Sequence, residues 1–278
     1  MKQGNTQGAS EQVQHEITLF AEPVLKFENF TITNSLLNSF ATVLILVLFF
    51  IAAGRKIKQI PKGIQNFFEM ILEESLTFAD TVTGSRKNSK RFLPIVLSLF
   101  LFILVNNWLG IFPGIGTIGF VDSHEGHKVF VPFFRGGTAD LNTTLALALI
   151  SIVGSHVFGV ITVGAWNYLN RFINIKALLE IPSKFRKDPS VILVNPIKVM
   201  VGMIEIVSEI AKVASLSFRL FGNIFAGEVL LVSMMALFAF LLPLPFMFME
   251  ILVGFIQALV FAILVLVFFT MATASAEH

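Results

Sequence analysis

The sequence predicts an all-α integral membrane protein, and two observations support this fold class. Of the 278 residues, 55% are hydrophobic and only 14% are charged, whereas soluble domains carry about 25% charged residues. The apolar residues gather in five segments, each long enough to cross a bilayer as a helix, which takes roughly 20 residues. One water-soluble core could not bury this much apolar surface, so we expect lipid to cover much of it.

Five transmembrane helices are expected, and the last two should form a long hairpin. The predicted spans are 36–54, 92–113, 141–166, 196–242 and 246–274. The fourth segment is far longer than one crossing requires, which predicts a strong tilt. The Pro243-Leu-Pro245 sequence predicts the turn between the last two spans, because proline ends helices. Residues 1–35 form a polar N-terminal extension, and residues 36–278 form the membrane domain.

The distribution of lysine and arginine predicts how the chain is oriented. Residues 55–91 hold eight of them and residues 167–198 hold six, whereas residues 1–35 and 114–140 hold two each. Because basic loops stay in the cytoplasm, the N-terminus should be periplasmic and the C-terminus cytoplasmic in a bacterial inner membrane. After the first span, apolar residues recur at helical spacing and predict an amphipathic helix on the cytoplasmic surface: Ile64, Phe67, Phe68, Ile71, Leu72 and Leu76.

Composition and motifs exclude several classes of function. The net charge of +2 is too small to predict nucleic-acid binding, and the absence of cysteine excludes thiolate metal sites. No phosphate-binding motif occurs, so the chain should not be an enzyme by itself, and we expect no cofactor. His124 and His127 suggest a metal site by residue type only, and their exposed loop favours solvated side chains, so no metal is expected.

Buried charge carries the functional signal. Five ionisable residues fall within 24 residues of the fourth segment, and Glu250 opens the fifth. A charge at mid-bilayer costs about 2.5–3.5 kcal/mol on insertion scales, so such residues should face a bundle interior, water or a partner. The five are Glu205, Glu209, Lys212, Arg219 and Glu228.

Helical geometry places Arg219 in the middle of a surface of small and polar residues. At about 100° per residue, the following residues lie within about 60° of Arg219: Ser208, Lys212, Ser215, Gly222, Asn223 and Ala226. Small residues let another helix approach closely in lipid. We therefore predict that this stripe is an interface with another protein.

The remaining polar residues suggest two separate paths for protons. Glu228 lies about 180° from Arg219 and points back into the subunit, and the hairpin should bring Glu250 near Glu228 and Gln257 near Arg219. An outer path could include Asp140, Asn223, Glu228 and Glu250, and an inner path Glu205, Ser208 and Glu209. Since arginine keeps its charge, Arg219 would separate the paths and discharge a carboxylate on a passing carrier.

The segment from Ser215 to Glu228, SLSFRLFGNIFAGE, resembles the signature of subunit a of bacterial F-type ATP synthases. Glu250 with Gln257, and Thr138-Ala-Asp-Leu-Asn142, fit the same family. The resemblance implies a stator subunit that works against a ring of c subunits and is held by a peripheral stalk of b subunits. It also implies that Arg219 is the essential arginine, that Asn223, Glu228, Glu250 and Gln257 serve the outer half-channel and ring interface, and that Glu205 lies on the exit path.

Other interpretations stay open from the residues alone. Lys212 and Glu209 could serve only to balance charge, Asp140 could be only a helix N-cap, and Glu228 with Glu250 could share a proton that pins the hairpin. The whole chain could instead be an independent proton-coupled secondary transporter, although it lacks the inverted repeats and broken helices typical of one. A purely structural anchor would not explain so many costly charges.

Overall fold

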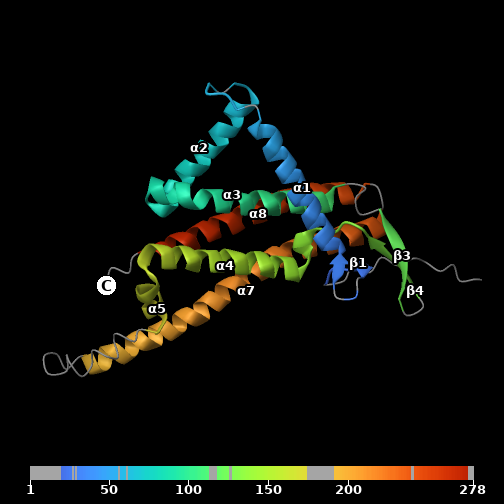
Figure 1. Ribbon diagram of the computed structural model, residues 1–278. Helices are drawn as coiled ribbons and strands as arrows, with labels where there is room; N and C mark the ends of the chain where they lie inside the picture. The colour runs from blue at the N-terminus through green and yellow to red at the C-terminus, as the bar shows by residue number, and fades with distance from the viewer. Residues whose placement is uncertain are drawn as a thin grey trace, which may run out of the picture.

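The computed structural model describes residues 20–274, with gaps at 27, 29, 56, 61, 113–117, 125–126, 174–190 and 239–240. Within this part of the chain, five helices are long and apolar enough to cross a membrane. They run side by side in one elongated bundle (Figure 1). The helices are α1 (Asn34–Gly54), α3 (Arg86–Ile111), α4 (Leu141–Val163), α7 (Val191–Leu237) and α8 (Pro243–Thr273). The prediction of an all-α integral membrane protein is confirmed.

The core of the bundle lies where α3, α4 and α8 meet. Phe92, Phe158 and Phe269 come one from each helix, and their ring centroids are 5.1 to 5.6 Å apart. Phe92 and Phe269 are almost completely buried. Large apolar side chains are exposed on the outer faces of the helices, for example Ile150 and Val153 on α4, as expected of a surface that lipid covers.

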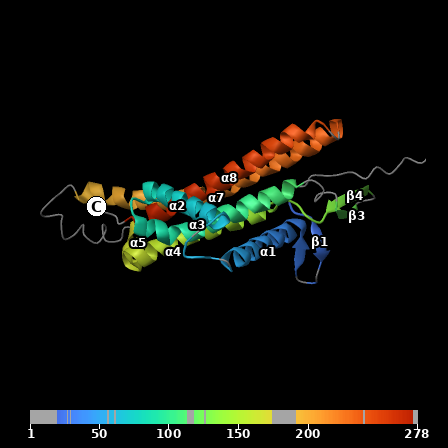
Figure 2. The same ribbon diagram turned by 90° about the horizontal axis from the view of Figure 1, so that it is seen from above.

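Helices α7 and α8 form the expected hairpin, but the turn lies earlier than predicted. Pro243 is the first residue of α8, so Pro243 and Pro245 belong to its first turn, and the chain turns just before them. Proline suits this position because the first amide of a helix has no partner to lose and the fixed φ favours helix. The 47-residue α7 crosses the bundle obliquely, and its N-terminal part extends beyond α4 (Figures 1 and 2).

The third predicted span is interrupted near its end. Helix α4 ends at Val163, because Gly164 adopts a positive φ of 89° that side-chain-bearing residues rarely adopt. A short helix, α5 (Ala165–Ile173), follows and packs against α7. Residues 164–166, expected as the end of the span, therefore form a corner and the start of α5.

The amphipathic segment is a helix, α2 (Ile64–Thr83), which packs against α3 and α8. Its predicted apolar face is largely exposed in the isolated chain, including Ile64, Phe67 and Leu72. Arg86 fixes the corner between α2 and α3, because its guanidinium bonds to Asp80 at 2.8 Å and also to Glu73. The position of α2 on a membrane surface stays a prediction.

Two β-hairpins, which were not predicted from the sequence, lie at one end of the bundle. Strand β1 (Pro23–Lys26) pairs antiparallel with β2 (Thr31–Thr33), and β3 (Gly119–His124) pairs antiparallel with β4 (His127–Pro132). A 3₁₀ turn, η2 (Gly137–Ala139), leads into α4. Helix α5 and the C-terminal end of α8 lie at the opposite end (Figures 1 and 2).

Candidate functional site

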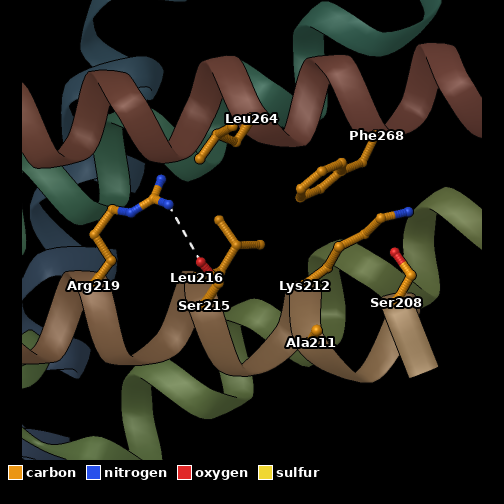
Figure 3. Close-up of a pocket in the computed structure, with 8 residues that line it drawn as sticks. All are labelled: Ser208, Ala211, Lys212, Ser215, Leu216, Arg219, Leu264 and Phe268. Carbon is orange, nitrogen blue, oxygen red and sulfur yellow. Dashed lines mark hydrogen bonds between the residues drawn. The ribbon is translucent and has the colours of Figure 1, made fainter.

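Arg219 lies in a groove of about 260 Å³ between α7 and α8. Its Nη2 donates a 3.3 Å hydrogen bond to the Ser215 hydroxyl, one turn earlier on α7. Lys212 extends from α7 toward α8 in the same groove, with its Nζ 5.3 Å from the centre of the Phe268 ring (Figure 3). The groove is lined by Ser208, Ala211, Lys212, Ser215, Leu216, Arg219, Leu264 and Phe268.

The hairpin also brings Gln257 to Arg219. The two residues line one small pocket together with Leu216, Leu220, Phe261 and Leu264. They are 38 positions apart in the sequence, and the antiparallel arrangement of α7 and α8 places them at the same level. The predicted level of Gln257 is confirmed, while its part in proton transfer stays a prediction.

The stripe around Arg219 faces outward. Ser208, Ser215, Arg219, Asn223 and Ala226 are exposed, and a side chain added at Gly222 would meet nothing within 4 Å. The sides of α7 away from the stripe are buried against the bundle through Ser217, Leu220 and Ile224, and Leu216 is buried between the stripe and α8. The helical geometry read from the sequence therefore holds, and the stripe is free to contact another protein.

Glu228 and Glu250 lie near each other, as the sequence predicts. Glu250 is 4% exposed, and its Oε2 has no hydrogen-bond partner among the described residues. Its carboxyl group lies directly over Gly227 of α7, where an added Cβ would be 2.7 Å from Oε1. Glu228 is held differently, by a forked ion pair with Arg135.

Arg135 is a residue of the site that sequence reasoning missed. Its side chain is only 5% exposed although it comes from the segment between β4 and η2. One signal could have pointed to it. Arg135 is one of two basic residues in 114–140, a loop predicted to lie on the periplasmic side, where basic residues are few. An arginine in that loop, five residues before Asp140 and the third span, would be expected to pair with an acidic side chain.

Asp140 is the N-cap of α4 and also connects α4 to α1. One carboxylate oxygen accepts from the Asn142 amide at 3.1 Å, and the other accepts from the Ser35 hydroxyl at 2.9 Å. The N-cap interpretation is thus confirmed, and the bond to Ser35 ties α4 to α1. Asp140 is 4% exposed.

Around Asp140 lies a buried polar layer that the sequence did not single out. The Asn38 amide donates to Asn106 at 3.2 Å, and Asn106 accepts from the Gly137 amide at 2.7 Å. Asn107 accepts from the Thr138 hydroxyl and donates to the Gly254 carbonyl at 3.1 Å. These bonds connect α1, α3, η2 and α8 at the end of the bundle that carries the strands.

A second polar cluster joins α4, α5 and α7 toward the opposite end. Glu209 accepts from Lys212 at 2.7 Å, and its other oxygen lies 3.7 Å from Nε2 of His156. The second ring nitrogen of His156 lies 2.7 Å from the Tyr168 hydroxyl. Neither His156 nor Tyr168 was predicted from the sequence. The predicted inner residue Glu205 is half-buried one turn before Glu209 on α7.

No metal centre is found in the part of the chain that the structure describes. No three His, Cys, Asp or Glu residues there are grouped so that they could hold an ion. The side chains of His124 and His127 lie outside the described residues.

The fold and the site define a class: a multi-pass membrane protein with a fixed arginine on one exposed helix face and separate polar clusters toward its two ends. The family model described as ATP synthase A chain matches residues 36–270. The chain therefore belongs to the ATP synthase subunit a family, whose members are components of the membrane sector and are not catalytic by themselves.

Individual relatives agree with the family match. The chain is similar to ATP synthase subunit a of Syntrophobacter fumaroxidans, with 32% identity over 92% of this chain and 91% of the relative. It is 34% identical to the Citrifermentans bemidjiense subunit over 84% and 83% of the two chains. It is 32% identical to a Campylobacter jejuni subunit over 84% and 87%. The alternative of an independent secondary transporter is set aside by this membership.

Proposed function

We propose that this chain is the proton-translocating stator subunit of a rotary ATP synthase, with two offset half-channels that Arg219 separates. The observation that carries the proposal is the outward-facing stripe of α7. Its centre is a permanent positive charge, and polar clusters lie to either side of it along the helix. A ring of c subunits would pack against the stripe at Ser208, Ser215, Gly222 and Ala226, where small side chains permit close approach.

The outer half-channel would run through the end of the bundle that carries the β-hairpins. Glu250 and Glu228 lie together there, and Asp140 is the buried N-cap of α4. Asn223 would present an amide on the stripe between these acids and Arg219, and Gln257 would do the same from α8. Protons from the periplasm would reach the ring carboxylate along these groups.

The inner half-channel would leave the stripe on the other side of Arg219. Glu205 and Ser208 lie on α7 toward the end that carries α5, beside the cluster of Glu209, Lys212 and His156. A proton released from the ring carboxylate would leave toward the cytoplasm here.

Arg219 would discharge the ring carboxylate and prevent a leak between the half-channels. A guanidinium stays protonated in proteins and favours the ionised form of a nearby acid. A proton that crossed directly would waste about 2.3 kcal/mol for each 100 mV of membrane potential. The ring must therefore turn for each proton to pass.

The orientation and the remaining partners follow from the basic loops. The N-terminus would be periplasmic and the C-terminus cytoplasmic in the bacterial inner membrane. The exposed apolar side chains of α2 would lie in the cytoplasmic lipid surface. A b-subunit peripheral stalk would hold the chain against the ring's torque.

The proposal is tested by ATP-driven acidification of inverted vesicles that carry the whole complex. Arg219→Ala should abolish acidification, whereas ATP hydrolysis by the catalytic sector released from the same membranes should persist. Arg55→Ala is the matched control, because Arg55 is an exposed residue at the end of α1, and it should pump as the unchanged complex does. Normal pumping by Arg219→Ala would refute the proposal.

A further inference from the structure

Arg135 binds Glu228 through a fork that engages both oxygens of the carboxylate. Its Nε lies 2.9 Å from Oε1 and 3.1 Å from Oε2, and its Nη2 lies 3.0 Å from Oε2. The arginine side chain is 5% exposed and the glutamate side chain 27%. Forked bonds between ionised partners are among the strongest hydrogen bonds in proteins. The Glu228 side chain is therefore held in place by a charged partner.

Glu250 lies near Glu228, but Arg135 does not bind it in the described part of the chain. It reaches Gly227, the residue before Glu228, from the opposite helix of the hairpin. Its Oε2 is buried and has no hydrogen-bond partner in the described part of the chain. Two acids so close cannot both be ionised at low cost unless each has a counter-ion. Arg135 compensates Glu228, so Glu250 is the acid that remains free to take up a proton.

Arg135 is also anchored by a part of the fold that lies outside the α7–α8 hairpin. Its Nη1 donates to the Phe20 carbonyl at 3.1 Å, just before β1. The adjoining chain is held in turn, because Glu22 and Asn34 exchange backbone and side-chain bonds at the start of α1. The guanidinium is thus presented to α7 from a separate part of the fold.

We infer that Arg135 is a positioning residue that locks Glu228 as a permanent carboxylate and thereby makes Glu250 the proton-exchanging acid of the outer half-channel. The inference rests on the proposed function. In each transfer, the Glu250 carboxylate takes one proton from a hydronium ion of the outer path, which becomes water. Glu250 then gives up that proton toward the ring carboxylate and returns to its ionised form. Glu228 neither gains nor loses a proton in this cycle.

The inference predicts a specific pattern of loss and rescue. In inverted vesicles with the intact complex, Arg135→Gln should lower ATP-driven acidification about tenfold or more, because it leaves two uncompensated acids. Glu228→Gln should cause a loss of similar size, because it removes the carboxylate that Arg135 binds, and the guanidinium can then favour the ionised form of Glu250. The double variant Arg135→Gln/Glu228→Gln removes both charges at once and should recover most of the lost rate.

Two further variants separate the charge argument from simple damage to the fold. Arg135→Lys keeps the charge and should pump faster than Arg135→Gln. Glu250→Gln should not pump, and adding the double variant should not rescue it. Each rate is divided by the amount of subunit in the membrane, measured by immunoblot. If Arg135→Gln does not accumulate, the rescue is read from Glu228→Gln against the double variant.

Two results would overturn the inference. The first is a double variant that pumps no better than Glu228→Gln, which would mean that Glu228 itself carries protons. The second is normal pumping by Glu250→Gln. Arg219→Ala is measured in the same vesicles: normal pumping there would refute the proposed function, whereas its loss together with an unrescued double variant would refute only the role of Arg135.

Discussion

At the scale of single residues, the site depends on close contacts around charges that are expensive to bury. Glu250 occupies space over α7 that exists only because residue 227 is glycine. The stripe shows the opposite case at Gly222, where the isolated chain leaves open space. The two glycines lie on one helix, and the difference between them distinguishes a contact inside the subunit from open space on the proposed partner surface.

Replacing Gly227 should therefore disturb proton uptake rather than folding. A methyl group in Gly227→Ala would lie 2.7 Å from Oε1 of Glu250, and the flexible glutamate can move aside at small cost to the fold. We expect normal amounts of the subunit in the membrane and ATP-driven acidification lowered severalfold, about 1 kcal/mol on the rate scale. Unchanged pumping would mean that the position of the Glu250 carboxyl group is not critical.

The sequence predicted part of this residue-scale arrangement. Helical spacing was enough to place Arg219, Asn223 and Ala226 on one face, because all three lie on one regular helix. The ion pair between Arg135 and Glu228 joins residues 93 positions apart. One sequence carries no information on which distant charges meet, so this pair could be found only in three dimensions.

At the scale of helices, hydropathy located the spans because a crossing helix must be almost wholly apolar. Their ends depend on local backbone chemistry that hydropathy does not record. The positive φ of Gly164 ends α4, and Pro243 begins α8 rather than ending the turn. The β-hairpins are short pairs outside the apolar segments, so their strands gave no signal comparable to that of the spans.

The packing of α4 against α8 provides a test at this scale. Gly159→Ala would place a methyl group 2.8 Å from the Ala272 backbone carbonyl and against the Tyr168 ring. A backbone atom cannot swing aside, so we expect destabilisation of about 1–3 kcal/mol, typical of overpacking. It should appear as a lower thermal midpoint of the complex purified in detergent.

Gly54→Ala is the matched control for Gly159→Ala. Gly54 ends α1, and an added Cβ there would meet nothing within 4 Å. Its thermal midpoint should equal that of the unchanged protein. Equal midpoints for both variants would show that α4 and α8 do not pack closely at Gly159.

At the scale of the whole molecule, the arrangement of the helices separates a buried acid on α8 from an exposed polar stripe on α7. Helix α8 lies between α3, α4 and α7, so the acid on α8 is buried while the stripe on α7 stays exposed. The number of helices long enough to span the membrane could be predicted from the sequence, but not which helices are neighbours. That order depends on side-chain packing between segments far apart in the chain.

The most direct test of the central claim asks what covers the stripe in the intact complex. The chain has no cysteine, so single cysteines at Ala226 on the stripe and at Val153 on the outer face of α4 can carry a photoactivated maleimide cross-linker. After illumination of native membranes, mass spectrometry identifies the adducts. We predict that position 226 joins a ring subunit and that position 153 joins only lipid. Lipid adducts alone at position 226 would contradict the account.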